Sequence, residues 1–271
     1  MGLPPTGAFK AASAAADVWV MRWLLLLVPI VVLAGVLWRR RSLAARQRQL
    51  MLLCQRSGLE FAPLDLRPDT AWLPFEMFGR EPSGTENVVW DDQAGRDVYV
   101  FDFWYQDVAD ERSIGRRRRL TCAVVPLPAS CPRMRITPRG VAGDATGAFR
   151  GAEVTLELEE FDRRFLVEAE DERSAFAFLD QRMMAAFLEL PDGVTAEVSE
   201  DVLLLSAPLL PPERVLLLFD AACKLQRLIP RVIASLFPHR PEQGAFERRW
   251  FQGRWSPDPT GASSSDRATS P

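Results

Sequence analysis

One stretch near the N-terminus restricts the fold of this chain more than any other feature. Residues 18–38 carry a single charge, on Arg22, and the part from Trp23 to Trp38 carries none. An α-helix over these residues, at about 1.5 Å per residue, is about 31 Å long, which matches a hydrocarbon core of about 30 Å. The chain as a whole has a mean hydropathy of -0.05, so its apolar character is concentrated here. We therefore predict one transmembrane helix over residues 18–38.

The residues that border this stretch fit a bilayer interface. Amphipathic aromatic rings and cationic side chains gather at the headgroup level of membranes. The aromatic members are Trp19, Trp23 and Trp38. The cationic members that follow directly are Arg39, Arg40 and Arg41. We predict that these residues anchor the helix and set its topology.

The distribution of basic residues predicts the orientation. Before Trp23 the basic residues are Lys10 and Arg22, whereas five arginines lie within about ten residues after Trp38. The positive-inside rule then places the N-terminus outside and the remainder in the cytoplasm, at the plasma (inner) membrane. The predicted segments are an extracytoplasmic tail (1–17), the transmembrane helix (18–38), a basic juxtamembrane helix (39–57), a cytoplasmic domain (58–238) and a disordered tail (239–271).

Three other N-terminal signals fit less well. A secretory signal peptide has its positive charge before the apolar run and a small-residue cleavage site after it, and neither is present. A lipoprotein signal needs Cys after Leu33-Ala34-Gly35, where this chain has Val36. The first six residues match a myristoylation pattern formally, but two prolines make them a poor acceptor.

The segment 58–238 predicts an α+β fold with a mainly antiparallel sheet and two helices in its C-terminal half. Residues 98–105 are β-branched and aromatic on both faces, which is typical of a central strand covered on both sides. Residues 58–86, rich in Pro and Gly, are expected to be irregular chain packed on the domain. The other predicted strands are 87–90, 119–127, 133–137, 153–159, 164–170 and a hairpin of 194–199 with 202–207. The predicted helices begin near Asp171 or Ser174, ending by Pro191, and at Pro212, with a kink at Pro230.

Composition argues against several classes of function. The 33 basic and 36 acidic residues give a net charge of -3, so the chain has no general attraction for nucleic acid. There is one histidine, His239, and none of the four cysteines forms a C-x-x-C pair, which argues against zinc. Phosphate-loop and nucleophile-elbow motifs are absent. We predict no catalytic residue, metal ion or cofactor, and reduced, buried thiols at Cys54, Cys122, Cys131 and Cys223.

Two places could bind a ligand. Asp102 lies on the otherwise apolar central strand, where it is either a buried acid in a pocket or a structural residue at a pair or strand end. A run of four arginines opens the next strand and could meet phosphate or lipid headgroups, or simply be solvated. Its members are Arg116, Arg117, Arg118 and Arg119.

Two further features carry open alternatives. The acidic group from Glu153 to Asp162 either binds a divalent cation or forms a solvated face. The charged residues of the last helix form one narrow stripe, so the rest of its circumference is apolar and needs a large partner surface. That surface is either the sheet, which we expect, or the membrane interface.

Several segments together resemble a known family. They are Phe101-Asp102-Phe103, the strand residues 121–125, the stretch 159–167 and Met183-Met184. They look like a family of uncharacterised, single-pass, membrane-anchored bacterial proteins, frequent in actinobacteria and known as a domain of unknown function. The resemblance covers residues 87–238, although the family often has Asn where this chain has Asp162. It implies a bacterial plasma membrane and one anchored domain, and it brings no activity or site residues.

Three functions therefore remain open from sequence. The first is an interaction or scaffold module that contacts a protein partner through sheet edges or the last helix. The second is a membrane-tethered domain that binds a small ligand or lipid headgroup through Arg116 to Arg119 or a pocket near Asp102. The third, an enzyme that uses carboxylates alone, is the least favoured.

Overall fold

The computed structural model of the chain divides into two units, Met1–Leu50 and Met51–Pro271. The predicted tails 1–17 and 239–271 both lie outside the described part of the chain. The described residues are 31, 33–35, 37–38, 40–64, 70, 73–91, 97–107, 116–140 and 149–238.

The predicted transmembrane segment falls mostly outside the described residues. Residues 18–30 lie outside them, and the described residues between 31 and 38 are helical, as are residues 40–57. The described large apolar side chains between residues 31 and 38 are exposed, with Leu33 at 59% and Trp38 at 76%. Within the described ranges, no helix is both long enough and apolar enough to cross a membrane.

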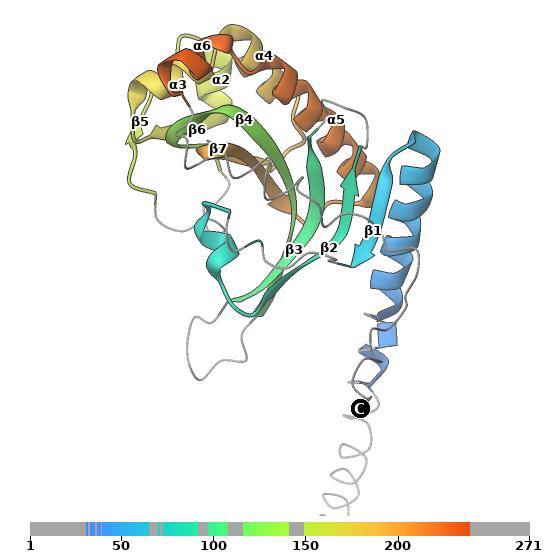
Figure 1. Cartoon of the computed structure of the whole chain (residues 1–271). Coiled ribbons are helices and arrows are strands. Elements are labelled where there is room, and N and C mark those ends of the chain that lie inside the picture. The colour runs from blue at the N-terminus through green and yellow to red at the C-terminus, as the bar shows by residue number, and fades with distance from the viewer. Residues whose placement is uncertain are drawn as a thin grey trace, which may run out of the picture. The chain divides into compact units, whose positions relative to one another are not determined.

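The second unit is an α+β domain on a seven-stranded sheet in which all strand pairings of the described residues are antiparallel (Figure 1). This confirms the predicted fold class of the domain. The order is β1-β2-β3-β4-β6-β5, and β7 pairs with the other edge of β4. The strands are β1 (Glu60–Leu64), β2 (Ser83–Trp90), β3 (Tyr99–Asp107), β4 (Arg116–Pro138), β5 (Ala152–Glu153), β6 (Phe165–Ala169) and β7 (Thr195–Pro208).

Two long strands replace four predicted short ones. The predicted strands 119–127 and 133–137 are both parts of β4, and the predicted hairpin of 194–199 with 202–207 is wrong because β7 runs straight through. β4 and β7 pair along their length and curve together (Figure 1). The pairing register shifts between Pro126 and Cys131, and again between Cys131 and Met134.

The prolines of β4 lie at this irregularity. On its other edge β4 pairs with β3 up to Val124 and with β6 from Met134 onward. Pro126, Pro128 and Pro132 lie between these two pairings, where a missing N–H removes no regular ladder bond. Proline therefore interrupts the ladder of β4 without ending the strand.

The helices are shorter and more numerous than predicted. The predicted helix before Pro191 divides in two because Asp180 accepts a hydrogen bond from Met183 N at 2.8 Å and so starts a new helix. Pro230 separates two helices instead of kinking one. Residues 153–159 form no full strand, and residues 58–86 hold β1, a 3-10 helix and the start of β2. The helices are η1 (Glu76–Gly79), α2 (Glu159–Arg164), α3 (Glu172–Phe178), α4 (Gln181–Leu188), α5 (Pro212–Leu228) and α6 (Arg231–Leu236).

Both faces of β3 are covered, as predicted for a central strand. One face packs Phe101 and Phe103 against the η1 segment, where the Phe78 and Phe103 rings lie 4.7 Å apart at an edge-to-face angle. α5 packs against β3 and β4, which confirms that this helix uses the sheet as a partner surface. Its buried residues include Val215, Leu218 and Phe219.

Candidate functional site

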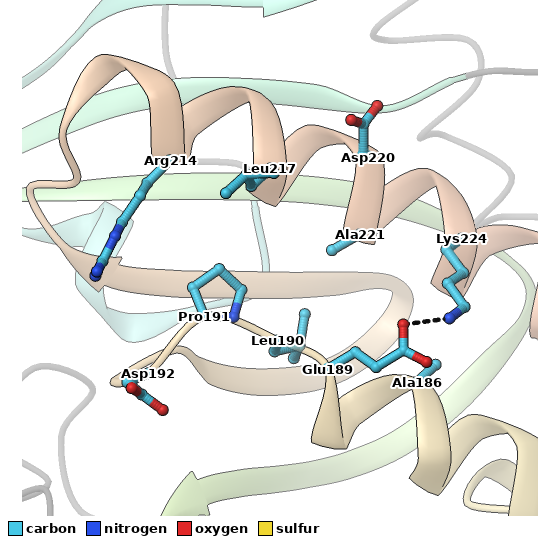
Figure 2. Close-up of a pocket in the computed structure, with 10 residues that line it drawn as sticks. All are labelled: Ala186, Glu189, Leu190, Pro191, Asp192, Arg214, Leu217, Asp220, Ala221 and Lys224. Carbon is cyan, nitrogen blue, oxygen red and sulfur yellow. Dashed lines mark hydrogen bonds and ion pairs between the residues drawn. The ribbon is translucent and has the colours of Figure 1, made fainter.

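An open pocket lies between the end of α4 and one face of α5 (Figure 2). Its volume is about 440 Å³, within the range of ligand-binding clefts. From α5 come Arg214, Leu217, Asp220, Ala221 and Lys224, and from the end of α4 and the following turn come Ala186, Glu189, Leu190, Pro191 and Asp192.

The α5 side of this pocket is a single helical stripe. Arg214, Leu217, Ala221 and Lys224 are spaced three, four and three residues apart, so they share one face. From the first to the last, the stripe is about 15 Å long at about 1.5 Å per residue. Leu217 lies near its middle and is 57% exposed, although most large apolar residues of α5 are buried.

The α4 side is held in place by Arg164. Its guanidinium donates to the carbonyl oxygens of Leu188 and Leu190, the second at 3.1 Å, and pairs with the Asp192 carboxylate at 3.2 Å. It thereby satisfies carbonyl groups that a helix end leaves without intrahelical partners. Gly193 follows with a φ of +79°, a conformation that glycine adopts without a steric penalty.

Charges of both signs stand around the apolar centre. Figure 2 shows Lys224 reaching from α5 to Glu189, with which it forms an ion pair, while Asp220 points away from it. Arg214 lies at the opposite end of the stripe and has no ion pair among the described residues. The pocket is thus an amphipathic groove, named here the α4–α5 groove, with a cation at each end.

Asp102, the acid predicted from sequence, lies inside a buried polar network. It is 2% exposed, and its two carboxyl oxygens accept hydrogen bonds from Asn87 Nδ2 at 2.8 Å and from Thr121 Oγ1 at 3.0 Å. The Thr121 hydroxyl accepts in turn from the Leu210 amide at 3.0 Å, just ahead of α5. Asp102 therefore bonds to other side chains of the domain, and it does not line the α4–α5 groove.

The predicted arginine run opens β4, and two of its members, Arg117 and Arg119, form a cluster with Glu86 and Trp104. Arg119 Nη1 lies 2.8 Å from Glu86 Oε2, and Arg117 Nη2 lies 3.8 Å from Glu86 Oε1. The guanidinium carbon of Arg117 lies 3.4 Å from the centre of the Trp104 ring. The side chain of Arg116 lies outside the described part.

The strand register places Asp102, Arg117 and Arg119 on one face of the sheet, whereas Arg118 lies on the other face. Residues two apart in a strand share a face, and Asp102 pairs across from Thr121 while Trp104 pairs across from Arg119. Glu86 of β2 lies opposite Asp102. The two sequence candidates are therefore neighbouring parts of one polar strip.

Other candidates from sequence do not converge on a ligand. Glu153 pairs with Arg139 at 3.1 Å, and Asp162 accepts from the Leu156 amide at 3.0 Å. Among the described residues, no group of three or more His, Cys, Asp or Glu side chains is placed to hold a metal ion.

The four cysteines are free and buried, as predicted. Burial raises the pKa of Cys54 to about 11 and that of Cys131 to about 12. Burial also raises the pKa of Cys122, and the nearby charge of Asp102 raises it further. Since the thiolate is the reactive form, these three thiols are suited to packing rather than to nucleophilic chemistry.

A second buried cluster lies on the C-terminal half of β4. Glu197 is 3% exposed and pairs with Arg133 at 2.8 Å and with Arg135 at 3.4 Å. Phe149 covers Arg135, whose guanidinium carbon lies 4.9 Å from the ring centre. A buried pair of this kind joins β4 to β7 where the two strands are in register.

Comparisons with known proteins give one distant likeness. No known family model matches the chain, and no curated protein matches it either. The crystal structure of the mycobacterial trehalose monomycolate transport factor A, TtfA, is similar with a TM-score of 0.46 and 16% sequence identity. The similar region covers 70% of this chain and 97% of that one. A likeness at this level does not define a family or a function for the chain.

Proposed function

We propose that this protein is a membrane-anchored interaction module whose α4–α5 groove docks a helix from a partner protein. The observation that carries the proposal is Leu217, a large apolar residue exposed at the centre of a preformed groove. Isolated exposed leucines are ordinary on protein surfaces. Here, however, the side chain lines a concave stripe with cations at both ends.

The shape and charge of the groove indicate what kind of helix it accepts. A stripe of about 15 Å matches nearly three turns of a helix running beside α5. Such a helix would place an apolar anchor against Leu217 and Ala221, as in other helix-in-groove complexes. An acidic residue at one end would meet Arg214, whereas Lys224 already has Glu189 as a partner.

The anchor belongs to the same proposal. The apolar stretch 18–38 and the arginines after it support insertion in a bacterial plasma membrane with the second unit in the cytoplasm. The exposed Leu33 and Trp38 agree with a lipid environment for the end of this stretch. Membrane fractionation and a reporter at the C-terminus test the anchor and the orientation, and a soluble full-length protein would contradict both.

Site-specific photo-crosslinking tests the groove. A photoreactive phenylalanine analogue replaces Leu217 in the full chain in cells, and Phe176 on α3, which is 48% exposed, is the matched control position. We expect one adduct of defined mass from position 217 that position 176 does not give. The partner identified from that adduct is then purified and titrated against the full chain in nanodiscs.

Two substitutions test whether the partner binds in the α4–α5 groove. Leu217→Glu places a charge at the apolar centre, and Arg214→Glu reverses the charge that would meet an acidic residue. We expect each to weaken binding by about tenfold or more, which corresponds to about 1.4 kcal/mol. Unchanged affinity for Leu217→Glu, or an equal effect of Phe176→Glu, contradicts docking in the groove.

A second candidate function, binding of a lipid headgroup, is supported by a separate observation. Arg117 and Arg119 of β4 lie with Glu86 and Trp104 on one face of β2, β3 and β4, whereas the α4–α5 groove is lined by residues of 186–192 and 214–224. The two functions are therefore compatible in one molecule.

A further inference from the structure

We propose that the α4–α5 groove selects helices that carry an acidic residue on one side of their apolar anchor and a basic residue on the other. The residues that make this selection are Arg214 and Asp220 of α5, which lie three positions before and three positions after Leu217. The inference rests on the proposed docking of a helix in the groove. It names the charge pattern that distinguishes a partner helix from other amphipathic helices.

The other charged residues that line the groove already have partners of opposite charge. Lys224 forms an ion pair with Glu189 across the groove, and Asp192 forms one with Arg164. Within each pair the formal charges cancel. These residues therefore give the groove little net charge with which to attract or reject a ligand.

Arg214 and Asp220 are the two lining residues whose charges are left without a partner. Both side chains are exposed, and neither forms a hydrogen bond or an ion pair with another residue in the described part of the chain. The guanidinium group of Arg214 can therefore donate its N–H groups to a ligand, and the carboxylate of Asp220 can accept from one.

The two charges flank Leu217 on opposite sides. At about 100° per residue, positions three before and three after a residue lie about 60° to either side of it, and about 4.5 Å along the axis in either direction. Figure 2 shows the side chains of Arg214 and Asp220 leaving α5 in opposite directions. A helix that covers Leu217 thus meets a cation on one flank and an anion on the other.

This arrangement favours one charge pattern in the partner. Residues four apart share a face of a helix, so an acid and a base four positions to either side of the anchor can reach both groups. An exposed ion pair strengthens binding by only up to about fivefold, and a like charge weakens it similarly. The pair therefore contributes more to the choice of partner than to the affinity of the best one.

The probes are three helical, hydrocarbon-stapled peptides with a leucine anchor. Four residues before and after that leucine they carry Glu and Lys, two Glu, or two Lys. Each peptide is labelled and titrated against the full chain in nanodiscs of phosphatidylcholine, with fluorescence anisotropy as the readout. We expect the wild type to bind the Glu/Lys peptide about five- to tenfold more tightly than either of the others, and Leu217→Glu to abolish binding of all three.

Charge reversal in the groove should change which peptide is preferred. Asp220→Lys creates two cations, so the Glu/Glu peptide should become the tightest ligand, and Arg214→Glu creates two anions, so the Lys/Lys peptide should. Arg227→Glu is the matched control, because Arg227 is an exposed residue of α5 that does not line the groove. It should keep the wild-type preference. A variant that only damages the fold would weaken all three peptides alike, and circular dichroism detects it.

The outcomes separate charge selection from docking itself. Equal affinity of the wild type for the three peptides, with binding lost in Leu217→Glu, overturns the charge selection and leaves helix docking in place. An unchanged preference in Asp220→Lys and Arg214→Glu, or a changed one in Arg227→Glu, has the same meaning. If no peptide binds, or if Leu217→Glu binds them as the wild type does, helix docking in the groove is contradicted together with the charge selection.

Discussion

The buried network around Thr121 gives a sharp test of what holds the domain together. The perturbation is Thr121→Val, which replaces a hydroxyl with a methyl group of similar size. Thr121 is fully buried, and its hydroxyl serves two partners at once. It donates to Asp102 at 3.0 Å and accepts from the Leu210 amide at 3.0 Å. The substitution therefore removes both hydrogen bonds without leaving a cavity.

The expected loss follows from the two groups left behind. Asp102 is 2% exposed and Leu210 is 6% exposed, so water has little access to replace the hydroxyl. A buried hydrogen bond that is lost without replacement by water costs about 1–3 kcal/mol, so the loss of both costs about 2–6 kcal/mol in free energy of unfolding. Asp102 keeps its bond from Asn87, so we expect a value of about 3 kcal/mol, near the lower half of that range.

The matched control is Thr121→Ser, which keeps the hydroxyl and loses one methyl group at a cost of about 1 kcal/mol. Urea unfolding of the full chain in nanodiscs, followed by tryptophan fluorescence, gives both values from shifts in midpoint at constant slope. In a thermal scan a loss of about 3 kcal/mol lowers Tm by about 6–12 °C. If the Val variant is as stable as the Ser variant, the two hydrogen bonds of Thr121 do not contribute the expected free energy of unfolding.

Four further perturbations have defined outcomes. Glu197→Ala leaves Arg135 buried without its carboxylate and should lower the free energy of unfolding by about 3–5 kcal/mol in the same urea assay. Gly193→Ala forces a side chain into a φ of +79° and should cost about 1–2 kcal/mol in that assay. Arg164→Gln releases the carbonyl groups at the end of α4 and should reduce the yield of the adduct formed at position 217. The pKa of Cys54 is raised to about 11, above its ordinary value of 9.0, so the thiolate fraction at pH 8 is about one in a thousand. Alkylation of this thiol in the native protein should be slow at pH 8 and rise toward pH 11. The pKa of Cys54 is higher in the folded protein than in the unfolded chain. The protonated thiol therefore contributes fully to the free energy of unfolding below about pH 9, and this contribution is lost as the pH rises through 11.

The local sequence pattern predicts the burial of β3 and β6 and the start of α3. The run 98–105 has apolar residues on both faces, and β3 is buried on both faces. Residues 164–170 alternate, and β6 has alternating burial. Asp171 caps α3 as its residue type predicts, accepting from the Arg173 amide at 3.0 Å.

The long strands could not be derived in the same way. Pro126 and Pro128 normally end a strand, and Ser199-Glu200-Asp201 resembles a turn. What keeps the chain extended at both places is the other strand, because Cys131 of β4 pairs with Glu200 of β7. Glu200 has a φ of +53°, so the irregularity in β7 is real but is accommodated as a bulge. The irregularity of β4 near Cys131 lies opposite the irregularity of β7 at Glu200. Their match depends on both strands, so the sequence of either strand alone does not predict it.

The groove was missed for a related reason. The charge stripe of the last helix indicated that a large apolar circumference needs covering, and α5 does bury one side on β3 and β4. Leu217 lies outside that contact and becomes part of a site only because the end of α4 lies beside it. A helix wheel can show an unburied leucine, but it cannot show which other element makes the surface concave.

Strand geometry unites the two binding candidates predicted from sequence, Asp102 and the arginine run, in one feature. Asp102 and Trp104 are two apart on β3, and Arg117, Arg119 and Thr121 are two apart on β4. On this single face the polar groups are fully buried at Thr121, 12% exposed at Arg119 and 37% exposed at Arg117. The interior end holds the hydrogen bonds of Thr121 with Asp102 and the Leu210 amide, whereas the outer end holds the contacts of Arg119 and Arg117 with Glu86 and of Arg117 with Trp104. The same alternation thus places Asp102, Arg117 and Arg119 on one face, and the effect of a change at either end can be measured at the other end by hydrogen exchange along β3.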